Sequence, residues 1–217
     1  MIIVDIETSG NFDPVKNGIW QIGAVEFENP SNVFLQEGRI DDEDAVEEGA
    51  IKVTGKTEAE MRDRNKQSQK ELLKNFFGWV EKIKDKTLVA HNTPFDYGFL
   101  IMKATKYNLK FPFSHRTLDL HPIAFLKYFQ IKNILPIEEG KSIMNLPKVI
   151  EFCGMKDERI QLKGNEIIKE GKPHNALEDA KVEAECLSRI LYGKVLFEEF
   201  VAFSVPEKLK KFSEKYI

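Results

Sequence analysis

The first forty residues alternate between apolar runs and turn-forming residues, as β-strands and their connections do. Residues 2–6 read IIVDI, residues 18–27 read GIWQIGAVEF, and residues 33–40 read VFLQEGRI. Between the last two runs, residues 28–32 (ENPSN) have the composition of a turn. The short connections predict three strands that pair as an antiparallel meander.

From residue 68 onward the apolar positions change to the spacing of amphipathic helices. Over residues 68–83 they recur three or four residues apart, which predicts a helix. The same spacing predicts further helices at 93–109, 121–129, 145–155 and 174–193, and a short helix begins within 50–61. Short strands are predicted at 87–90 and 116–120. Thr93 is the expected N-cap of its helix, with Pro94 at the first helical position.

Strands come first along the chain, and strands that alternate with helices follow. This order predicts an α/β fold in which one mixed sheet is covered by helices. The 217 residues, 42% of them hydrophobic, suffice for one sizeable core, so we expect one domain rather than two. Residues 156–173 are polar and rich in Gly and Pro, and we interpret them as a mobile loop. The tail, 194–217, carries two amphipathic pieces split by Pro206.

Charge and cysteine content narrow the class of protein. The net charge of −3 and the pI of about 5.9 argue against a protein that coats nucleic acid, although they do not exclude a nucleic-acid enzyme. Cys153 and Cys186 lack metal-ligand spacing and are interpreted as reduced core thiols. The chain shows no signal peptide and no run of about 20 apolar residues. We therefore expect a soluble, cytoplasmic protein.

Two acids lie in the first predicted strand, where burial would be costly. Asp5 and Glu7 share one face of that strand with Ile3, because side chains alternate between faces. Like charges so close repel, and burial costs several kcal/mol for each unless something compensates. Either the strand is a solvated edge or a cation lies there. The TSG sequence that follows suits the ligand crevice at the end of an α/β strand.

Three later residues carry the same kind of ambiguity. Asp96 falls in the first turn of its predicted helix, where an acid also stabilises free amides and the helix dipole. Asp179 shares a mostly small and apolar helix side with Ala176, Val182 and Cys186. His174 lies just before that helix; a lone histidine is usually structural or exposed, but at a loop-to-helix junction next to a partly buried acid a functional role is equally plausible.

Together these residues have the composition that two-metal phosphoryl chemistry needs. Two divalent ions carry a charge of about +4, which four carboxylates match, and the ions lie ~4 Å apart in such sites. Oxygen ligands favour Mg²⁺ or Mn²⁺ over zinc. The sequence therefore predicts a site with two Mg²⁺ or Mn²⁺ ions, with a histidine close by.

Three motifs, DIETSG, HNTPFD and HNALEDA, resemble in this order and spacing the motifs of the DEDDh exonucleases. This 3′–5′ exonuclease superfamily includes the bacterial DNA polymerase III proofreading subunit and ribonuclease T. The likeness also covers IWQIGAVEF, AIKVTGKT and NLPKVIEFCGM, and so spans residues 1–192. A His five residues before the last Asp resembles the DEDDh branch rather than the DEDDy branch. Residues 193–217 are expected to form a helical extension that packs on, or docks from, the same domain.

The resemblance implies a ribonuclease-H-like fold, with a mixed sheet of about five strands, the first three antiparallel, flanked by helices. It implies that Asp5, Glu7, Asp96 and Asp179 bind the metals and that His174 is the general base. Substrate contacts are implied for five residues: Thr8, Ser9, Thr54, Asn92 and Phe95. Many relatives have a His at the position of Thr54, so this chain departs from the family there.

The implied activity is a metal-dependent 3′–5′ exonuclease that releases nucleoside 5′-monophosphates from single-stranded DNA. The alternative within enzymes is an exoribonuclease of the ribonuclease T or oligoribonuclease type. The alternative outside enzymes is a catalytically silent nucleic-acid-binding or polymerase-associated module. The expected partners are nucleic acid with a free 3′ end and, as a further candidate, a DNA polymerase.

Four basic residues are candidates for backbone contacts, although a solvated helix face explains them as well: Lys103, Lys106, Lys110 and Arg116. Phe12 and Trp20 are candidates for base stacking, with core packing favoured for Trp20.

Overall fold

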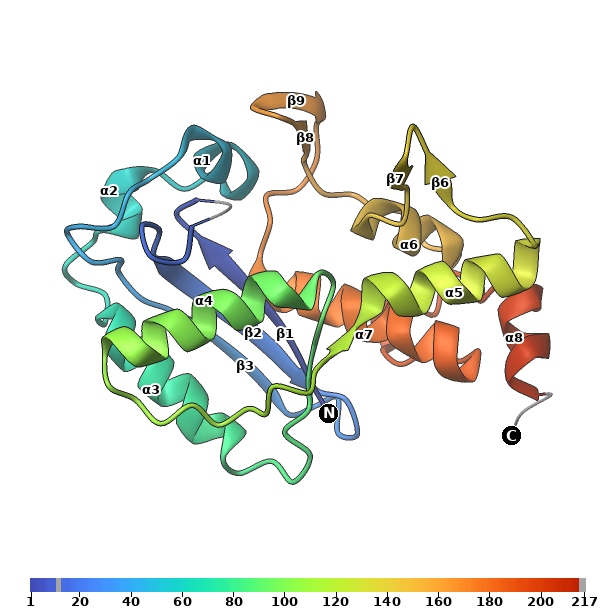
Figure 1. The fold of residues 1–217 in the computed structure, drawn as a ribbon, viewed down its shortest axis with the longest axis horizontal. Coiled ribbons are helices and arrows are strands. Elements are labelled where there is room, and N and C mark those ends of the chain that lie inside the picture. The colour runs from blue at the N-terminus through green and yellow to red at the C-terminus, as the bar shows by residue number, and fades with distance from the viewer. Residues whose placement is uncertain (11–12, 215–217) are drawn as a thin grey trace.

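A five-stranded sheet with the order β3-β2-β1-β4-β5 runs through the fold (Figure 1). The structure is a computed structural model, and it describes residues 1–10 and 13–214. The five strands are β1 (Ile2–Thr8), β2 (Ile19–Glu26), β3 (Val33–Glu37), β4 (Leu88–Ala90) and β5 (Leu118–Asp119). β1, β2 and β3 are antiparallel, whereas β4 pairs parallel with β1 and β5 pairs parallel with β4. The predicted mixed sheet with an antiparallel first half is confirmed.

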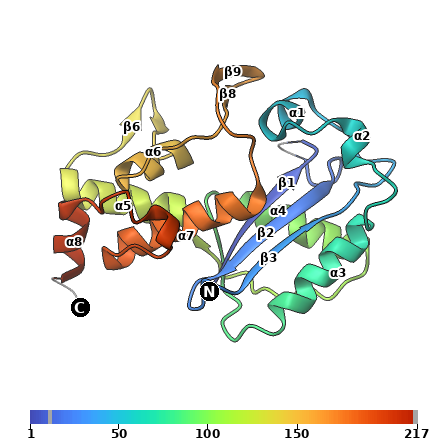
Figure 2. The same ribbon diagram turned by 180° about the vertical axis from the view of Figure 1, so that it is seen from behind.

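Helices cover both faces of this sheet, and two small hairpins lie outside it (Figures 1 and 2). The helices before the last sheet strand are α1 (Glu48–Thr54), α2 (Glu58–Met61), α3 (Gln69–Val80) and α4 (Thr93–Lys106). The later helices are α5 (Leu120–Lys132), α6 (Leu146–Phe152), α7 (Ala176–Tyr192), the 3₁₀ turn η1 (Glu198–Phe200) and α8 (Glu207–Glu214). The hairpins are β6 (Ile137–Glu138) with β7 (Lys141–Ser142), and β8 (Gln161–Lys163) with β9 (Glu166–Lys169).

The alternation of side chains along β1 divides the core into two layers. Ile2, Val4 and Ile6 pack with α3 and α4 on one face. Ile3 packs with α5, α6 and α7 on the other face. Asp5 follows the parity of Ile3, so it points toward the α7 side. Figures 1 and 2 show α4 and α7 on opposite faces of β1 and β2.

A glycine allows α7 to approach the sheet next to Asp5. Gly23 on β2 pairs with Asp5 across the antiparallel ladder. A Cβ atom on Gly23 would lie 2.1 Å from the Ala176 carbonyl carbon and 2.2 Å from the Leu177 nitrogen. These are backbone atoms that cannot rotate away. The absence of a side chain at residue 23 therefore lets the first turn of α7 rest on the strand that faces Asp5.

Residues 156–173 are not the mobile loop that we expected. They form the β8–β9 hairpin, whose strands are joined by Gly164 and Asn165, with Gly164 at φ +61°. A bridge between Arg159 and Lys172 closes the base of the hairpin. The Gly-Asn pair is a hairpin turn signal between short alternating runs. Its polar flanks obscured the strands, because a hairpin that stands out from the core needs few apolar residues.

The start of α4 also differs from the prediction. The N-cap is Asn92, in the left-handed conformation at φ 69°, and Thr93 is the first helical residue. The Thr93 hydroxyl donates to the Leu118 carbonyl at 2.6 Å instead of capping the helix. Thr93 thus ties the first turn of α4 to β5, next to the sheet edge.

The C-terminal part packs on the α7 side of the molecule. Leu209 of α8 is buried in the same cluster as Leu187 and Ile190 of α7. Cys153 and Cys186 are both buried and free, as predicted. Within the described residues, no helix combines the length and the apolar character that a membrane crossing requires.

We predict that Gly23→Ala destabilises the protein by about 3 kcal/mol or more, because the new methyl group overlaps the backbone of α7. The control is Gly78→Ala, an exposed position within α3 where an added Cβ meets nothing within 4 Å. That change should stabilise the helix by about 0.5–1 kcal/mol. Urea unfolding of both variants tests the contrast. Equal stabilities would show that α7 does not depend on residue 23.

Candidate functional site

Five carboxylates from three elements gather around the C-terminal half of β1. Asp5 and Glu7 extend from β1, Asp96 from the first turn of α4, and Asp179 and Glu183 from α7. All except Asp5 are buried, and Asp5 is partly exposed. The structure therefore brings together the four acids predicted to bind metal and adds a fifth, Glu183.

Contacts between β2 and α7 hold the two acids of α7 in place. The Gln21 side-chain oxygen accepts a hydrogen bond from the Ala176 amide at 2.8 Å. Asn175 caps α7, and its side chain accepts from the amides of Leu177 and Glu178. Glu183 lies one turn after Asp179, and its Oε2 accepts from the His91 amide at 3.0 Å. These bonds fix the direction in which α7 presents its carboxylates.

Burial and mutual repulsion strongly disfavour the ionised form of these acids. Burial, followed by the charges of neighbouring acids such as Asp179, raises the pKa of Asp5 well above its ordinary value. The pKa of Glu7 rises from 4.5 to about 8, mainly because of burial and then the charge of Asp179. Burial also raises the pKa values of Asp96 and Glu183 well above their ordinary ranges. The cluster thus needs positive charge to be ionised near neutral pH.

His174 lies at the edge of the cluster, and both of its ring nitrogens face oxygen atoms. Nδ1 is 3.2 Å from Asp179 Oδ2, and Nε2 is 2.9 Å from the Ile160 carbonyl oxygen. Burial lowers the pKa of His174, but the bonds to Asp179 and Ile160 outweigh this, and the pKa is raised overall. In this position His174 is set up to donate two hydrogen bonds rather than to accept a proton.

Arg159, from the base of the β8–β9 hairpin, supplies a second positive charge. Its Nη1 is 3.2 Å from Asp179 Oδ2, the same oxygen that His174 contacts. Its Nε and Nη2 donate to the two carboxylate oxygens of Asp157, at 2.9 and 3.1 Å. The guanidinium is therefore held by one acid while it contacts another.

Two carboxylate oxygens in the cluster lack a hydrogen-bond partner. Glu7 Oε1 and Asp179 Oδ1 are buried and have none among the described residues. Ligand atoms of Glu7, His174 and Asp179 all lie within 4.8 Å of one another. Buried oxygens without donors are costly unless a cation binds them. The donor set, mostly carboxylates, fits a hard divalent ion such as Mg²⁺ or Mn²⁺.

A cavity of about 230 Å³ opens beside Asp5 and Glu7. Three of the predicted substrate contacts line it, namely Thr8, Thr54 and Phe95, and His174 forms another part of its wall. Two predicted contacts lie elsewhere. Ser9 is fully buried, and its hydroxyl donates to the Ala45 carbonyl at 2.6 Å. Asn92 is exposed, and its amide donates to Asp119 Oδ1.

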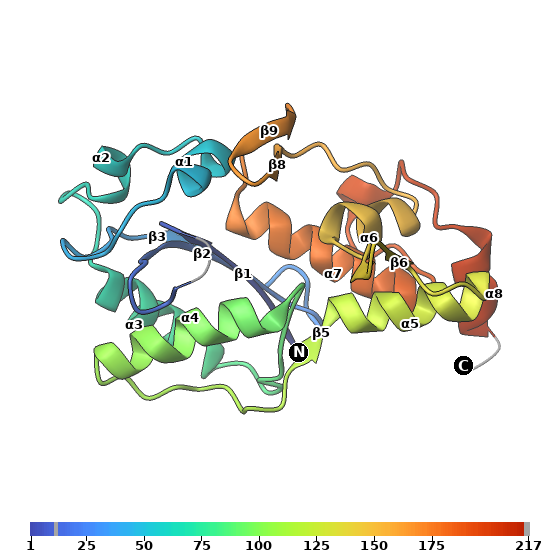
Figure 3. The same cartoon turned by 45° about the horizontal axis from the view of Figure 1, so that its top comes forward.

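A second cavity, of about 360 Å³, lies next to the cluster beneath the β8–β9 hairpin, and it shares Asp5, Val53 and His174 with the first. Asp5, Asp179 and Glu183 line it together with Leu162 and Ile168 of the hairpin. Figure 3 shows the hairpin standing beside α1, above the start of α7. The Lys52 amino group of α1 donates to the Asn165 carbonyl at 2.8 Å, which ties the hairpin to α1. The two cavities therefore meet at Asp5 and His174.

Of the four basic residues near the second motif, Lys110 and Arg116 are exposed, whereas Lys103 and Lys106 are paired with acids. Lys103 is buried and forms an ion pair with Asp44 at 2.9 Å. Lys106 contacts Asp41 and Glu43. Trp20 is buried with Ile40 and Met61, so it packs in a core as favoured above. Phe12 lies outside the described residues.

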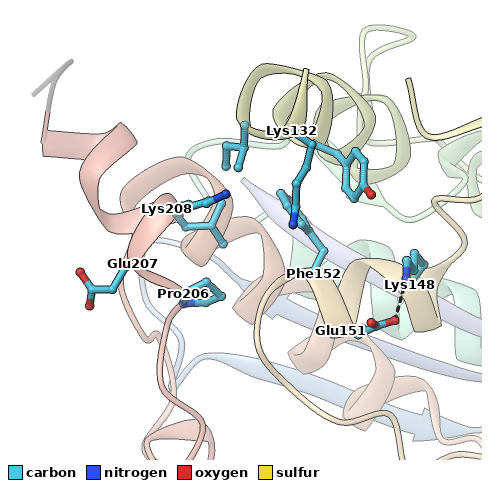
Figure 4. A pocket seen from close by; sticks show the side chains of 10 residues that line it. Lys132, Lys148, Glu151, Phe152, Pro206, Glu207 and Lys208 are labelled. Carbon is cyan, nitrogen blue, oxygen red and sulfur yellow. Dashed lines mark hydrogen bonds and ion pairs between the residues drawn. The ribbon is translucent and has the colours of Figure 1, made fainter. Parts of the chain in front are cut away.

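A third cavity, of about 290 Å³, lies far from the acids, between α5, α6 and α8 (Figure 4). Lys132 and Lys208 extend over it beside Phe152, and Lys148 forms an ion pair with Glu151 at 2.9 Å. None of the clustered carboxylates lines it. The chemistry suggested by the acids therefore belongs to the other two cavities.

Sequence reasoning missed Glu183 and Arg159. Glu183 follows Asp179 by four residues, and this spacing places both on one side of a helix. That signal was present in the sequence. Arg159 carried no comparable signal, because its position depends on a hairpin between two polar segments.

Comparison with known proteins identifies relatives of this chain. Residues 2–187 match the family model RNase T, described as exonuclease. A PolC-type DNA polymerase III of Thermotoga maritima is 29% identical over 193 residues, which are 88% of this chain and 12% of that protein. The DNA polymerase III subunit epsilon of Buchnera aphidicola is 34% identical over 119 residues, 50% of this chain and 46% of that one. The chain thus spans less than half the length of these relatives.

Solved structures share the fold at low sequence identity. The nuclease domain of 3′hExo, a DEDDh family member bound to rAMP, aligns with a TM-score of 0.61 and 19% identity, over 95% of both chains. Escherichia coli Exonuclease I in complex with a dT13 oligonucleotide aligns with a TM-score of 0.61 and 16% identity, over 87% of this chain and 40% of that one. The expected ribonuclease-H-like fold of the DEDDh nucleases is confirmed.

We predict that the metal-free protein loses stability as the pH rises from about 5 to 8. A carboxyl group whose pKa is higher in the folded state binds more protons when folded, so its contribution is complete below the unfolded pKa and is lost through the folded pKa. For Glu7, that window runs from 4.5 to about 8. The raised pKa of His174 acts in the same direction. The loss should be on the order of a few kcal/mol.

Thermal unfolding in EDTA and in saturating Mg²⁺, at several pH values, measures this effect. Mg²⁺ should raise the Tm more at pH 8 than at pH 5.5, because the ion binds the ionised acids of the folded state. Glu7→Gln, which removes one of the titrating groups, should flatten the pH dependence in EDTA. A Tm that is independent of pH in EDTA would contradict the electrostatic description of the cluster.

Proposed function

The chain belongs to the RNase T family of exonucleases, and on that premise we propose that it is a two-metal 3′–5′ exonuclease. Its substrate is nucleic acid with a free 3′ end, single-stranded DNA in the first place, and its products are nucleoside 5′-monophosphates. The observation that carries this proposal is the cluster of Asp5, Glu7, Asp96 and Asp179, of which all but Asp5 are buried and two of whose oxygens lack a donor among the described residues.

We assign the metal ions to these four acids. Asp5 and Glu7 come from one strand, and Asp96 and Asp179 come from helices on opposite faces of the sheet, so the carboxylates surround a common space. Two Mg²⁺ or Mn²⁺ ions, when bound, would activate a water molecule and stabilise the charge of the departing 3′ oxygen. Bound ions also favour the ionised carboxylates and so reverse the raised pKa values of the cluster.

His174 is assigned as the general base that takes a proton from the attacking water. A base needs a nitrogen with a free lone pair, but Nε2 of His174 is engaged by the Ile160 carbonyl at 2.9 Å. The role therefore requires that the ring turn away from Ile160. The contact between Nδ1 and Asp179 can orient the ring during this change.

The cavity beside Asp5 and Glu7 is assigned to the 3′-terminal nucleotide. Phe95 offers an aromatic surface for a base, and Thr8 and Thr54 form its polar wall. Thr8 donates its hydroxyl hydrogen to the Gly10 carbonyl, so its oxygen remains an acceptor, whereas the Thr54 hydroxyl donates to the Ala50 carbonyl and already accepts from the Lys56 amide at 3.3 Å. A sugar hydroxyl of the nucleotide is a suitable hydrogen-bond donor to a threonine oxygen at this position.

DNA is favoured over RNA because the relatives found by sequence are DNA polymerase III proteins. The same relatives favour a DNA polymerase as the partner of this protein, and the cytoplasm as the compartment in which it acts. An exoribonuclease is the second candidate, favoured by the fold shared with a nuclease domain that binds rAMP. A silent binding module is disfavoured, because four acids and a histidine are all present in one site.

We predict that the protein shortens 3′-extended single-stranded DNA in the presence of Mg²⁺ and that Asp5→Asn reduces this activity to background. The amide keeps the shape of the side chain but removes a charged metal ligand. The measurement is the stepwise shortening of 5′-labelled DNA and RNA in parallel, resolved by length. RNA shortened much faster than DNA would favour the second candidate, and no cleavage of either by the wild-type protein would contradict the enzyme assignment.

His174→Gln separates the base from the metal ligands in the same assay. It should retain Mg²⁺-dependent stabilisation, because the four acids remain, yet lose about 10²–10⁴-fold in rate, the typical contribution of a general base. Asp85→Asn is a control on an exposed acid at the opposite end of β1 and should leave the rate unchanged. A His174→Gln rate close to wild type would remove His174 from the mechanism.

A further inference from the structure

Arg159 contacts the acid cluster but belongs to none of the three sequence motifs, and the mechanism above does not use it. It comes from the segment before the third motif, where the β8–β9 hairpin begins. Its side chain is only 12% exposed, although it is a charged residue next to a cavity. Burial of a charged side chain is costly, so we expect Arg159 to serve a function at this position.

Asp157 holds the Arg159 guanidinium in a fixed direction. The two Asp157 oxygens accept from Nε and Nη2, and Asp157 Oδ1 also accepts from the Arg159 amide at 3.0 Å. Gln161 donates to the other Asp157 oxygen at 3.2 Å. A planar guanidinium group that is hydrogen-bonded at two of its nitrogens cannot rotate freely, so the third nitrogen, Nη1, is directed at Asp179.

The cluster contains more carboxylates than two divalent ions can neutralise. Two divalent ions offset four negative charges, but the cluster holds five carboxylates once Glu183 is included. Arg159, whose guanidinium also pairs with Asp157, brings positive charge to within 3.2 Å of Asp179 Oδ2, the oxygen that His174 contacts as well.

We propose that Arg159 is a built-in counter-ion of Asp179, which offsets the charge of this acid in the metal-free protein and lowers the affinity of the site for divalent ions. The effect acts through charge rather than by blocking the position. Asp179 Oδ1 has no partner within the described part of the chain, so an ion can approach that oxygen while Arg159 stays on Oδ2. The proposal rests on the assignment of Asp179 as a metal ligand.

The test is calorimetric titration of the full chain with Mn²⁺, without nucleic acid. Arg159→Gln should bind Mn²⁺ at least threefold more tightly than the wild-type protein, because a positive charge next to the ions is lost. Arg159→Lys should fall between the two, since an ammonium keeps the charge but cannot hold Asp157 and Asp179 together. Without metal, Arg159→Gln should melt at a lower temperature than the wild type.

Lys172→Gln is the matched control. Lys172 lies opposite Arg159 at the base of the same hairpin, but its side chain is 76% exposed and pairs with Glu158. Its loss should leave the Mn²⁺ affinity unchanged.

A folded Arg159→Gln that binds Mn²⁺ equally or more weakly would overturn the proposal, because Arg159 would then only orient Asp179. If this variant does not fold, Arg159→Lys decides, and an affinity no tighter than that of the wild type overturns the proposal. If the wild-type protein binds no Mn²⁺, the metal assignment itself is contradicted. If the wild-type protein binds Mn²⁺ tightly and Arg159→Gln does not bind it more tightly, only the proposal for Arg159 is contradicted.

Discussion

Repulsion among buried carboxylates is the constraint on which the rest of this structure depends. Five acids share one small region, and burial raises the pKa of Glu7 to about 8. Such a cluster is stable only with protons, protein cations or metal ions next to it. His174 and Arg159 supply protein cations at one oxygen of Asp179, and the partnerless oxygens of Glu7 and Asp179 remain for metal ions.

The fold brings these acids together through a few close contacts between backbone segments. β1 places two acids on one face by alternation, and Gly23 on the neighbouring strand leaves room for the first turn of α7. Gln21 then binds the Ala176 amide, which fixes the direction of α7. Asp96 enters from the opposite layer because Thr93 ties the start of α4 to β5. The contacts that pack α4 and α7 against the sheet are thus also the contacts that position the acids.

The motif residues and the main elements could be predicted because their signals are local. Strand alternation identified Asp5, and helical spacing identified Asp179, with His174 just before its helix. The β8–β9 hairpin could not be predicted in the same way, because it contributes little to the core and its polar strands resemble a loop. Arg159 depends on that hairpin, and Ser9 on the turn that buries it, so both needed three-dimensional contacts that sequence spacing does not encode.

The central claim is that the four motif acids hold two divalent ions. Anomalous diffraction from crystals grown with saturating Mn²⁺ and a nucleoside 5′-monophosphate tests it most directly. The account predicts two manganese peaks about 4 Å apart among the carboxylates of Asp5, Glu7, Asp96 and Asp179. Crystals that show no manganese among these acids, or show it only elsewhere on the protein, would contradict the account.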